Sequence, residues 1–103
     1  MRVVDEACLR RLARNEVGRL GFSLDALPVV EPVTYVLEGL TAHLAVGRSA
    51  SSAARQGAVA CLQVEDNPQG EPAVSVLATG RLRLVEDGLA EMLIELLSET
   101  PTG

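Results

Sequence analysis

The segment PVVEPVTYVL, residues 28–37, is rich in β-branched side chains and contains the single tyrosine, a composition that favours a strand. Pro32 interrupts the segment, and a proline within a strand belongs at an edge or a bulge. EVGRLGFS (16–23) precedes it and TAHLAV (41–46) follows it, and both also have the character of strands. We therefore expect three successive strands, with a turn over residues 24–27 between the first two.

Two further strand-like segments follow in the second half of the chain. AVACLQVE (58–65) is almost continuously apolar, which predicts a buried strand. AVSVLATGRLRLVE (73–86) alternates apolar and polar residues over a long stretch, and Gly80 would let it bend at a barrel corner. The sequence thus places all its expected strands between residues 17 and 86.

Three helices are expected around these strands. Asp5 can cap a helix over residues 5–15, and a short alanine-rich helix is expected at 51–56. A C-terminal helix is expected at 87–99, because its apolar residues are spaced close to a helical period. That apolar stripe consists of Leu89, Met92, Leu93, Leu96 and Leu97.

Several short strands, tight turns and few helices favour a small β-barrel or sandwich, and closure of a barrel would remove exposed strand edges. Neither an internal repeat nor a linker is visible, so we expect a single domain over residues 1–103. The fold class expected from the residues is therefore mainly β and antiparallel, with a helix at each end of the sequence.

The amino-acid composition and the net charge argue against several classes of function. Hydrophobic residues make up 48% of the 103 residues, with one Phe, one Tyr and no Trp, so the core must be aliphatic. A net charge of −5 argues against nucleic-acid binding and against docking on an anionic membrane. Cys8 and Cys61 lack a CxxC partner and are expected to be buried hydrophobes. With neither a signal peptide nor a membrane span visible, we expect a cytoplasmic protein.

Four stretches together resemble the pyridoxamine 5′-phosphate oxidase-like family, the FMN-binding split β-barrels, and in particular its small bacterial group. They are EVGRLGF, PVVEPVTYVLEG, TAHLAVGRSASSAAR and VLATGRLRLVED, and the resemblance extends over residues 5–90. It implies a split β-barrel with short flanking helices, a homodimer, and a flavin in the groove between protomers. It also implies an oxidoreductase acting on a small redox substrate, in which hydride moves to and from the flavin N5.

The resemblance also implies which residues contact the flavin. The ring would pack against Pro32, Val33, Thr34 and Tyr35, and the phosphate would lie near Val46 and the segment GRSASSAAR (47–55). Backbone N–H groups at a helix N-terminus favour an anion. Hydroxyl groups and a guanidinium would add further donors to the phosphate. Those side chains are Arg48, Ser49, Ser51 and Ser52.

The chain departs from the family pattern at the phosphate. It contains no lysine, and Ala45 stands where the family has an arginine, while Ala50 or Ser52 stands where it has a lysine. A tryptophan of the family is also missing from EPAVSV (71–76). The cofactor therefore stays open between FMN and the deazaflavin F420. A degenerate barrel that has lost flavin and binds a small ligand or a protein is an alternative, as is a purely structural or regulatory dimer.

The remaining polar residues have ordinary structural interpretations beside the functional ones. GRSASSAAR can be a solvated turn, and Thr34 and Tyr35 can be simple strand residues. His43 is expected to be a partly exposed strand residue, and neither a catalytic residue nor a metal ligand is predicted. Four carboxylates at element ends are expected to be solvated or to cap an element: Glu65, Asp66, Glu86 and Asp87. Arg81 and Arg83 alternate with leucines, which suits a solvent-facing strand edge, and a place in a groove is the alternative.

Overall fold

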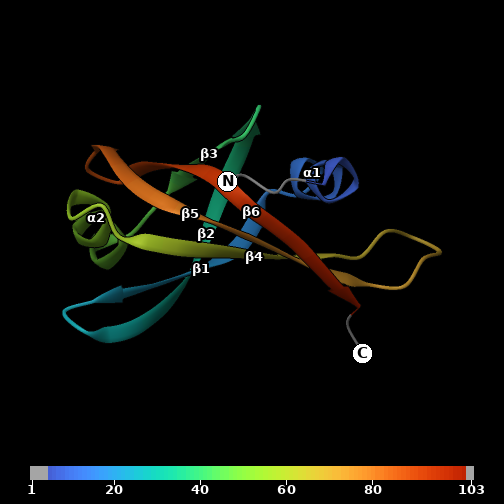
Figure 1. The fold of residues 1–103 in the computed structure, drawn as a ribbon, viewed down its shortest axis with the longest axis horizontal. Helices are drawn as coiled ribbons and strands as arrows, with labels where there is room; N and C mark the ends of the chain where they lie inside the picture. The colour runs from blue at the N-terminus through green and yellow to red at the C-terminus, as the bar shows by residue number, and fades with distance from the viewer. Residues whose placement is uncertain (1–4, 102–103) are drawn as a thin grey trace.

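The computed structural model describes residues 5–101; the outermost parts of the expected 1–103 domain, residues 1–4 and 102–103, lie outside the described range. Within that range, six antiparallel strands form a closed barrel in the order β1-β2-β3-β6-β5-β4. The helices lie on opposite sides of it, α1 beside one end and α2 beside the other (Figure 1). In chain order the elements are α1 Glu6–Ala13, β1 Val17–Leu24, β2 Leu27–Glu38, β3 Thr41–Ala45, α2 Arg48–Arg55, β4 Val59–Asp66, β5 Val74–Glu86 and β6 Leu89–Pro101.

The barrel is filled by aliphatic side chains, as its composition predicts. The largest fully buried side chains are leucine, valine, isoleucine and methionine. Phe22 and Tyr35 are the aromatic members of this core, and both are buried. Along β4 the residues alternate between buried and exposed, so the strand has one face inward and one outward. The fully buried side chains that the strands contribute to this core are Leu20, Leu44, Leu62, Val64, Val76, Leu82, Met92 and Ile94.

The β1–β2 hairpin explains the proline inside β2. The two strands pair from Val17 opposite Thr34 to Leu24 opposite Leu27, which confirms the turn expected at 24–27. β2 pairs with β3 only from Thr34 onward. Pro32 therefore lies on the part of β2 whose second edge is free, where its missing N–H costs no ladder hydrogen bond.

The expected C-terminal helix at 87–99 is wrong, because this segment is strand β6. It pairs with β3 on one side and with β5 on the other. Ala90, Met92 and Ile94 are buried with the two-residue period of a strand, and the next buried residue is Leu97.

A β-bulge produced the misleading helical spacing. The register of β5 and β6 shifts between Thr79 and Gly80, so Ile94 lies opposite Gly80 and Leu96 opposite Thr79. Glu95 is the extra residue, and it changes the spacing of buried residues from two to three. A Cβ on Gly80 would overlap the carbonyl oxygen of Leu93, so this close approach of the two strands requires glycine. The bend expected at Gly80 is thus a bulge.

Helix α2 begins three residues earlier than the helix expected at 51–56 and includes almost all of the segment GRSASSAAR. Its alanines at 50, 53 and 54 are buried against the barrel, mainly over β5 and β1. Gly57, with φ of 69°, follows the helix and turns the chain into β4. The small side chains let α2 lie close to the barrel, with Arg48, Ser49 and Arg55 exposed and Ser51 buried with the alanines.

Candidate functional site

The N-terminus of α2 already holds an anionic group from the protein itself. Its N-cap residue is Gly47, which has no side chain to cap the helix. Instead, Glu31 of β2 accepts a hydrogen bond from the backbone N–H of Ala50 at 3.1 Å. A Cβ on Gly47 would lie 2.8 Å from the Glu31 carboxylate, so glycine makes room for this contact. Glu31 thus occupies a position that favours a negative charge.

A small hollow of about 310 Å³ lies beside this helix end and contains most of the residues expected near the phosphate. Val46, Arg48, Ser51 and Ser52 all line it, whereas Ser49 does not. Ser51 is buried, and its hydroxyl accepts a hydrogen bond from the backbone N–H of Gly88 at 3.3 Å. Arg48 is exposed and has no hydrogen-bond partner within residues 5–101, so its donors are available to a ligand.

The residues expected near the flavin ring are divided between the two faces of β2. Val33 and Tyr35 point into the core. The Tyr35 hydroxyl donates to the carbonyl oxygen of Leu12 at 2.6 Å, and burial raises the pKa of this phenol. Thr34 points outward and lines a second hollow of about 380 Å³. Pro32 borders a different hollow on the β1 side of the strand. Of the four residues expected near the ring, Thr34 and Tyr35 line the second hollow, and of these two only Thr34 has an outward side chain.

These first two hollows are neighbours in the fold. Ala45 and Leu89 line the hollow over β2 and β3, whereas Val46 and Gly88 line the hollow beside α2. Ala45 is followed directly by Val46, and Gly88 directly by Leu89, so each hollow takes one residue from each of these two chain segments. The backbone N–H of Val46 donates to the carbonyl oxygen of Gly88 at 2.9 Å. The end of β3 and the start of β6 therefore separate the hollow beside α2 from the hollow beside the outward face of β2.

His43 lies on the exposed face of β3, as expected. Its Nε2 lies 3.2 Å from Glu38 Oε1, and its Nδ1 lies 3.8 Å from Glu91 Oε2. Glu91 also accepts from Arg83. Within the described residues, no group of three or more His, Cys, Asp or Glu side chains could hold a metal ion. The arrangement on this face is therefore a charged cross-strand network.

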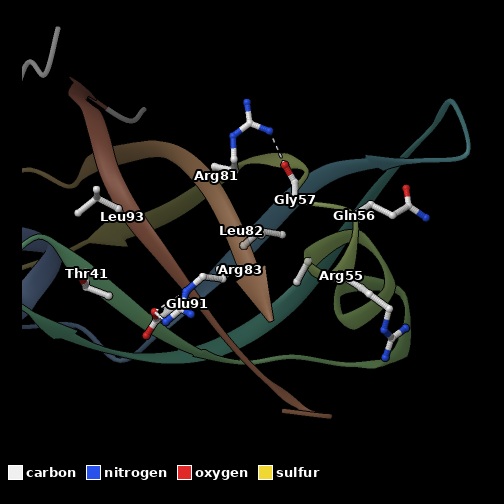
Figure 2. A pocket seen from close by; sticks show the side chains of 10 residues that line it. Thr41, Arg55, Gln56, Gly57, Arg81, Leu82, Arg83, Glu91 and Leu93 are labelled. Carbon is white, nitrogen blue, oxygen red and sulfur yellow. Dashed lines mark hydrogen bonds and ion pairs between the residues drawn. The ribbon is translucent and has the colours of Figure 1, made fainter. Parts of the chain in front are cut away.

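A third and larger hollow, of about 700 Å³, lies between the C-terminal end of α2 and strands β3, β5 and β6 (Figure 2). Leu82 and Leu93 give it apolar walls, and Arg81 and Arg83 of β5 reach its rim. Arg81 Nη1 donates to the carbonyl oxygen of Gly57 at 2.5 Å. Both arginines are exposed, as expected, and both also border this hollow, which agrees with the alternative of a groove position.

The other end of the barrel has a buried charge that the sequence analysis missed. The Asp66 side chain is 4% exposed and accepts from Arg11 at 3.0 Å, from Arg14 at 2.5 Å and from Asn15 at 2.9 Å. Hydrogen bonds from Arg14 first, then from Asn15 and Arg11, hold the pKa of this carboxyl well below its usual range, against the opposing effect of burial. The expectation that Asp66 is solvated or caps an element is wrong, because it joins α1 to β4.

The two cysteines are free, and Cys8 does not have the setting of a nucleophile. Cys8 is buried, and its thiol donates to Glu99 Oε2 at 3.3 Å. Burial, and then the hydrogen bond and charge of Glu99, raise the pKa of Cys8 to about 11. A thiol with this pKa is protonated at neutral pH and unreactive. The expectation of a buried residue is confirmed for Cys8, whereas Cys61 is half-buried.

Comparison with known proteins identifies the family. The family model described as pyridoxamine 5′-phosphate oxidase matches residues 4–101. An FAD-binding protein from Mesorhizobium loti is structurally similar, with a TM-score of 0.78 and 21% identity over 96% of this chain and 93% of that one. The FAD-binding protein from Mycobacterium smegmatis gives a TM-score of 0.77 and 16% identity over 100% of this chain and 99% of that one.

Two negative findings accompany these matches. No curated protein sequence matches the chain significantly. In the part of the chain that the structure describes, neither helix is long and apolar enough to cross a membrane. The family match extends over almost the whole chain, and the barrel has the fold of the two solved neighbours. The chain therefore belongs to the pyridoxamine 5′-phosphate oxidase family and has its split β-barrel fold.

Proposed function

We propose that this protein is a cytoplasmic, flavin-binding oxidoreductase that works as a homodimer. The observation that carries the proposal is the adjacency of two hollows at the end of β3, one lined by Arg48, Ser51 and Ser52 and the other by Thr34 and Ala45. An anionic phosphate suits the first, and a flat ring suits the second. Two solved neighbours are named as FAD-binding proteins, which supports a flavin.

The residues at the first hollow fit a phosphate group, although with few cations. Arg48 offers a guanidinium, Ser52 offers a hydroxyl, and the first turn of α2 offers backbone N–H groups. Arg55 also lines the hollow, but it pairs with Asp87 at 3.2 Å. Glu31 at the same helix end opposes an added negative charge. We therefore expect flavin affinity that depends strongly on Arg48.

The chain's own residues would bind and orient the flavin rather than react. When bound, a flavin supplies hydride acceptance and donation, and the protein supplies position and exclusion of water. Thr34 and Val36 present an outward strand surface on which a ring can lie, while His43 and Glu16 border that hollow with titratable side chains. A small redox substrate would approach the ring on the side away from β2.

A homodimer would cover an apolar part of the outer barrel face. Val36 on β2 is 67% exposed, and Leu89 and Leu93 on β6 are 45% and 41% exposed. β3 lies between these two strands, so all three side chains lie on one continuous sheet. They flank the network of His43 and Glu91, and exposed apolar side chains beside polar groups are typical of a contact surface. The face includes Leu89 beside the expected flavin ring, so the partner would close that hollow.

The test is a visible absorption spectrum of the purified protein after incubation with FMN, FAD or F420 and removal of unbound ligand. We expect a retained flavin band, and a dimer by light scattering. Arg48→Gln should weaken flavin binding by about tenfold through loss of a charge-assisted contact. Arg10→Gln, an exposed arginine on α1, is the matched control and should leave binding unchanged. Protein that retains none of the three would contradict the proposal.

A second function remains a candidate because of Glu31. A carboxylate at the N-terminus of α2, together with the absence of lysine, disfavours a doubly charged phosphate. A barrel that has lost flavin would bind a neutral small ligand or another protein instead. Protein that stays colourless with every flavin, yet remains a folded dimer, would favour this second function.

A further inference from the structure

We infer that the outer wall of the barrel carries a second ligand site, independent of the proposed flavin site, and that it binds a free α-amino acid with an aliphatic side chain. The site is the hollow of about 580 Å³ that Pro32 borders on the β1 side of β2. Three features of this hollow support the site: two strands that separate there, an arginine and a glutamate that form no ion pair, and an apolar rim.

The hollow lies where strands β1 and β4 separate. The two strands pair over a short ladder that ends with Arg19 opposite Gln63. Beyond this pair, β1 extends to Val17 beside β2, whereas β4 follows β5 past Glu65. Gly18 lies at the fork, and a Cβ on it would lie 2.8 Å from the carbonyl oxygen of Gln63, so glycine lets the strands approach closely just before they part. The fork therefore opens the outer wall, and the backbone groups on its two sides have no ladder partner across it.

An arginine and a glutamate face this opening without pairing to each other. Arg19 and Glu65 both line the hollow, and both are exposed. Glu65 lies two residues beyond Gln63, the partner of Arg19, so the two side chains are diagonal neighbours on the outer face of the sheet. Within residues 5–101, none of the ion pairs includes either of them. Arg19 also borders a smaller hollow with Glu31, but the Glu31 carboxylate is bound to Ala50 of α2.

Two opposite charges in one hollow favour a zwitterion. The Arg19 guanidinium can bind a carboxylate through two parallel N–H donors, and the Glu65 carboxylate can accept from an ammonium group. Glu65 would repel a ligand that carries only negative charge, and Arg19 would repel one that carries only positive charge. Gln63 and Ser75, which lie 3.5 Å apart, offer further polar contacts. An α-amino acid fits this arrangement because it carries both charges on one carbon atom.

The rim of the hollow favours an aliphatic side chain on that amino acid. Val17 is 62% exposed, and Pro32 is also exposed, and both line the hollow. An aliphatic side chain would remove part of this apolar surface from water, whereas a charged side chain would not. The volume of the hollow is also within the range of small-molecule sites, about 300–1,000 Å³.

The first test is a titration of isotope-labelled protein with L-leucine, followed by amide NMR. We expect L-leucine to shift the signals of Gly18, Arg19, Gln63 and Ser75, because these residues line the hollow. Leucinamide lacks the carboxylate, and N-acetyl-L-leucine lacks the ammonium group. Each should bind at least about tenfold more weakly than L-leucine, because each loses one charge-assisted contact and faces one like charge.

The second test assigns each charge of the ligand to one residue. Arg19→Gln should weaken L-leucine binding by about tenfold and abolish the preference for L-leucine over leucinamide. Glu65→Gln should weaken it similarly and abolish the preference over N-acetyl-L-leucine. Arg10→Gln on α1 and Glu86→Gln on β5 remove exposed charges elsewhere and should leave binding unchanged. A thermal melt of each variant verifies folding.

Two results would overturn the inference. If L-leucine shifted none of these four signals, the hollow would not be an amino-acid site. If L-leucine, leucinamide and N-acetyl-L-leucine bound equally well, the two charges would not select the ligand. None of these measurements involves a flavin, so protein that retains flavin but does not respond to L-leucine would leave the proposed function standing and remove this site alone.

Discussion

The two helices lie at opposite ends of the barrel and are attached to it by different interactions. Helix α1 is fixed by a buried charge, Asp66, which binds two arginines and an asparagine from the end of that helix. Helix α2 is held by buried alanines and a single carboxylate contact from Glu31, and two hollows lie along it. The α1 end thus satisfies its charges internally, whereas the α2 end leaves arginine donors for a ligand. The proposed binding site and the buried charge network that stabilises the fold therefore lie at opposite ends of one small barrel.

The largest effect is expected from Asp66→Ala. This change removes the shared acceptor of Arg11 and Arg14 and leaves a buried gap between α1 and β4. Losing one partner of a buried ion pair is strongly destabilising, and because Arg14 is 50% exposed we expect the free energy of unfolding to fall by about 2–3 kcal/mol.

Urea denaturation followed by circular dichroism measures this loss. Asp87→Ala is the matched control at the α2 end, because Asp87 is 91% exposed and also pairs with an arginine. It should cost less than about 0.5 kcal/mol. If both variants lost the same free energy of unfolding, the carboxylate at the α1 end would be no more important for stability than the one at the α2 end.

The same carboxylate predicts a dependence of stability on pH. Hydrogen bonds from Arg14, Asn15 and Arg11 lower the pKa of Asp66 in the folded protein. Its contribution is therefore fully present above the unfolded pKa of about 4 and is lost as the pH falls toward the folded value. Wild type should lose more stability than Asp66→Ala below pH of about 4, measured by urea titrations at each pH. Parallel curves for the two proteins would show that Asp66 is not the group responsible.

A smaller effect is expected from Glu31→Gln at the α2 end. Loss of the negative charge at the helix N-terminus should lower the free energy of unfolding by about 0.5–1 kcal/mol. The same change should tighten binding of inorganic phosphate, because the protein's own anion no longer competes for the helix N-terminus. Isothermal titration with phosphate measures this, with Glu38→Gln, an exposed residue of the same strand, as control. Weaker phosphate binding in Glu31→Gln would show that Glu31 assists the anion.

The smallest effect concerns the β1–β2 hairpin, whose tip lies on the same side of the barrel as α2 (Figure 1). Asp25 and Ala26 at its turn have φ of 51° and 67°, values that favour glycine at the second position. Ala26→Gly should therefore raise the free energy of unfolding by about 0.5 kcal/mol, measured by thermal unfolding. Flavin or phosphate binding should not change. A lower melting temperature would mean that the turn is not strained.

The first five strands were predictable from the sequence because their apolar residues alternate or run continuously, and because turn residues separate them. Strand β6 was not, since the bulge at Glu95 gives its buried residues a mixed spacing that resembles a helix. A clue was available in Gly80, which was expected to mark a bend in the partner strand. Local spacing cannot show on which strand the extra residue of a bulge lies.

The site was predictable only where it is local in sequence. Val46, Arg48, Ser51 and Ser52 lie together because one strand end and one helix start bring them together. Glu31 and Asp66 were missed because their partners lie 19 and up to 55 residues away, so pairing depends on the barrel register. The family resemblance assigned the flavin ring to a strand, but only the structure shows that Val33 and Tyr35 point into the core.

The central claim is that the proposed flavin binds at the α2 end of the barrel, whereas helix α1 only stabilises the fold. Amide hydrogen exchange measured with and without FAD tests this claim most directly. We expect slower exchange at residues 46–57 and 81–93, which border the α2 hollows, and unchanged exchange in α1 and at the end of β4. Protection confined to α1, or unchanged exchange along α2 when FAD is present in excess, would contradict it.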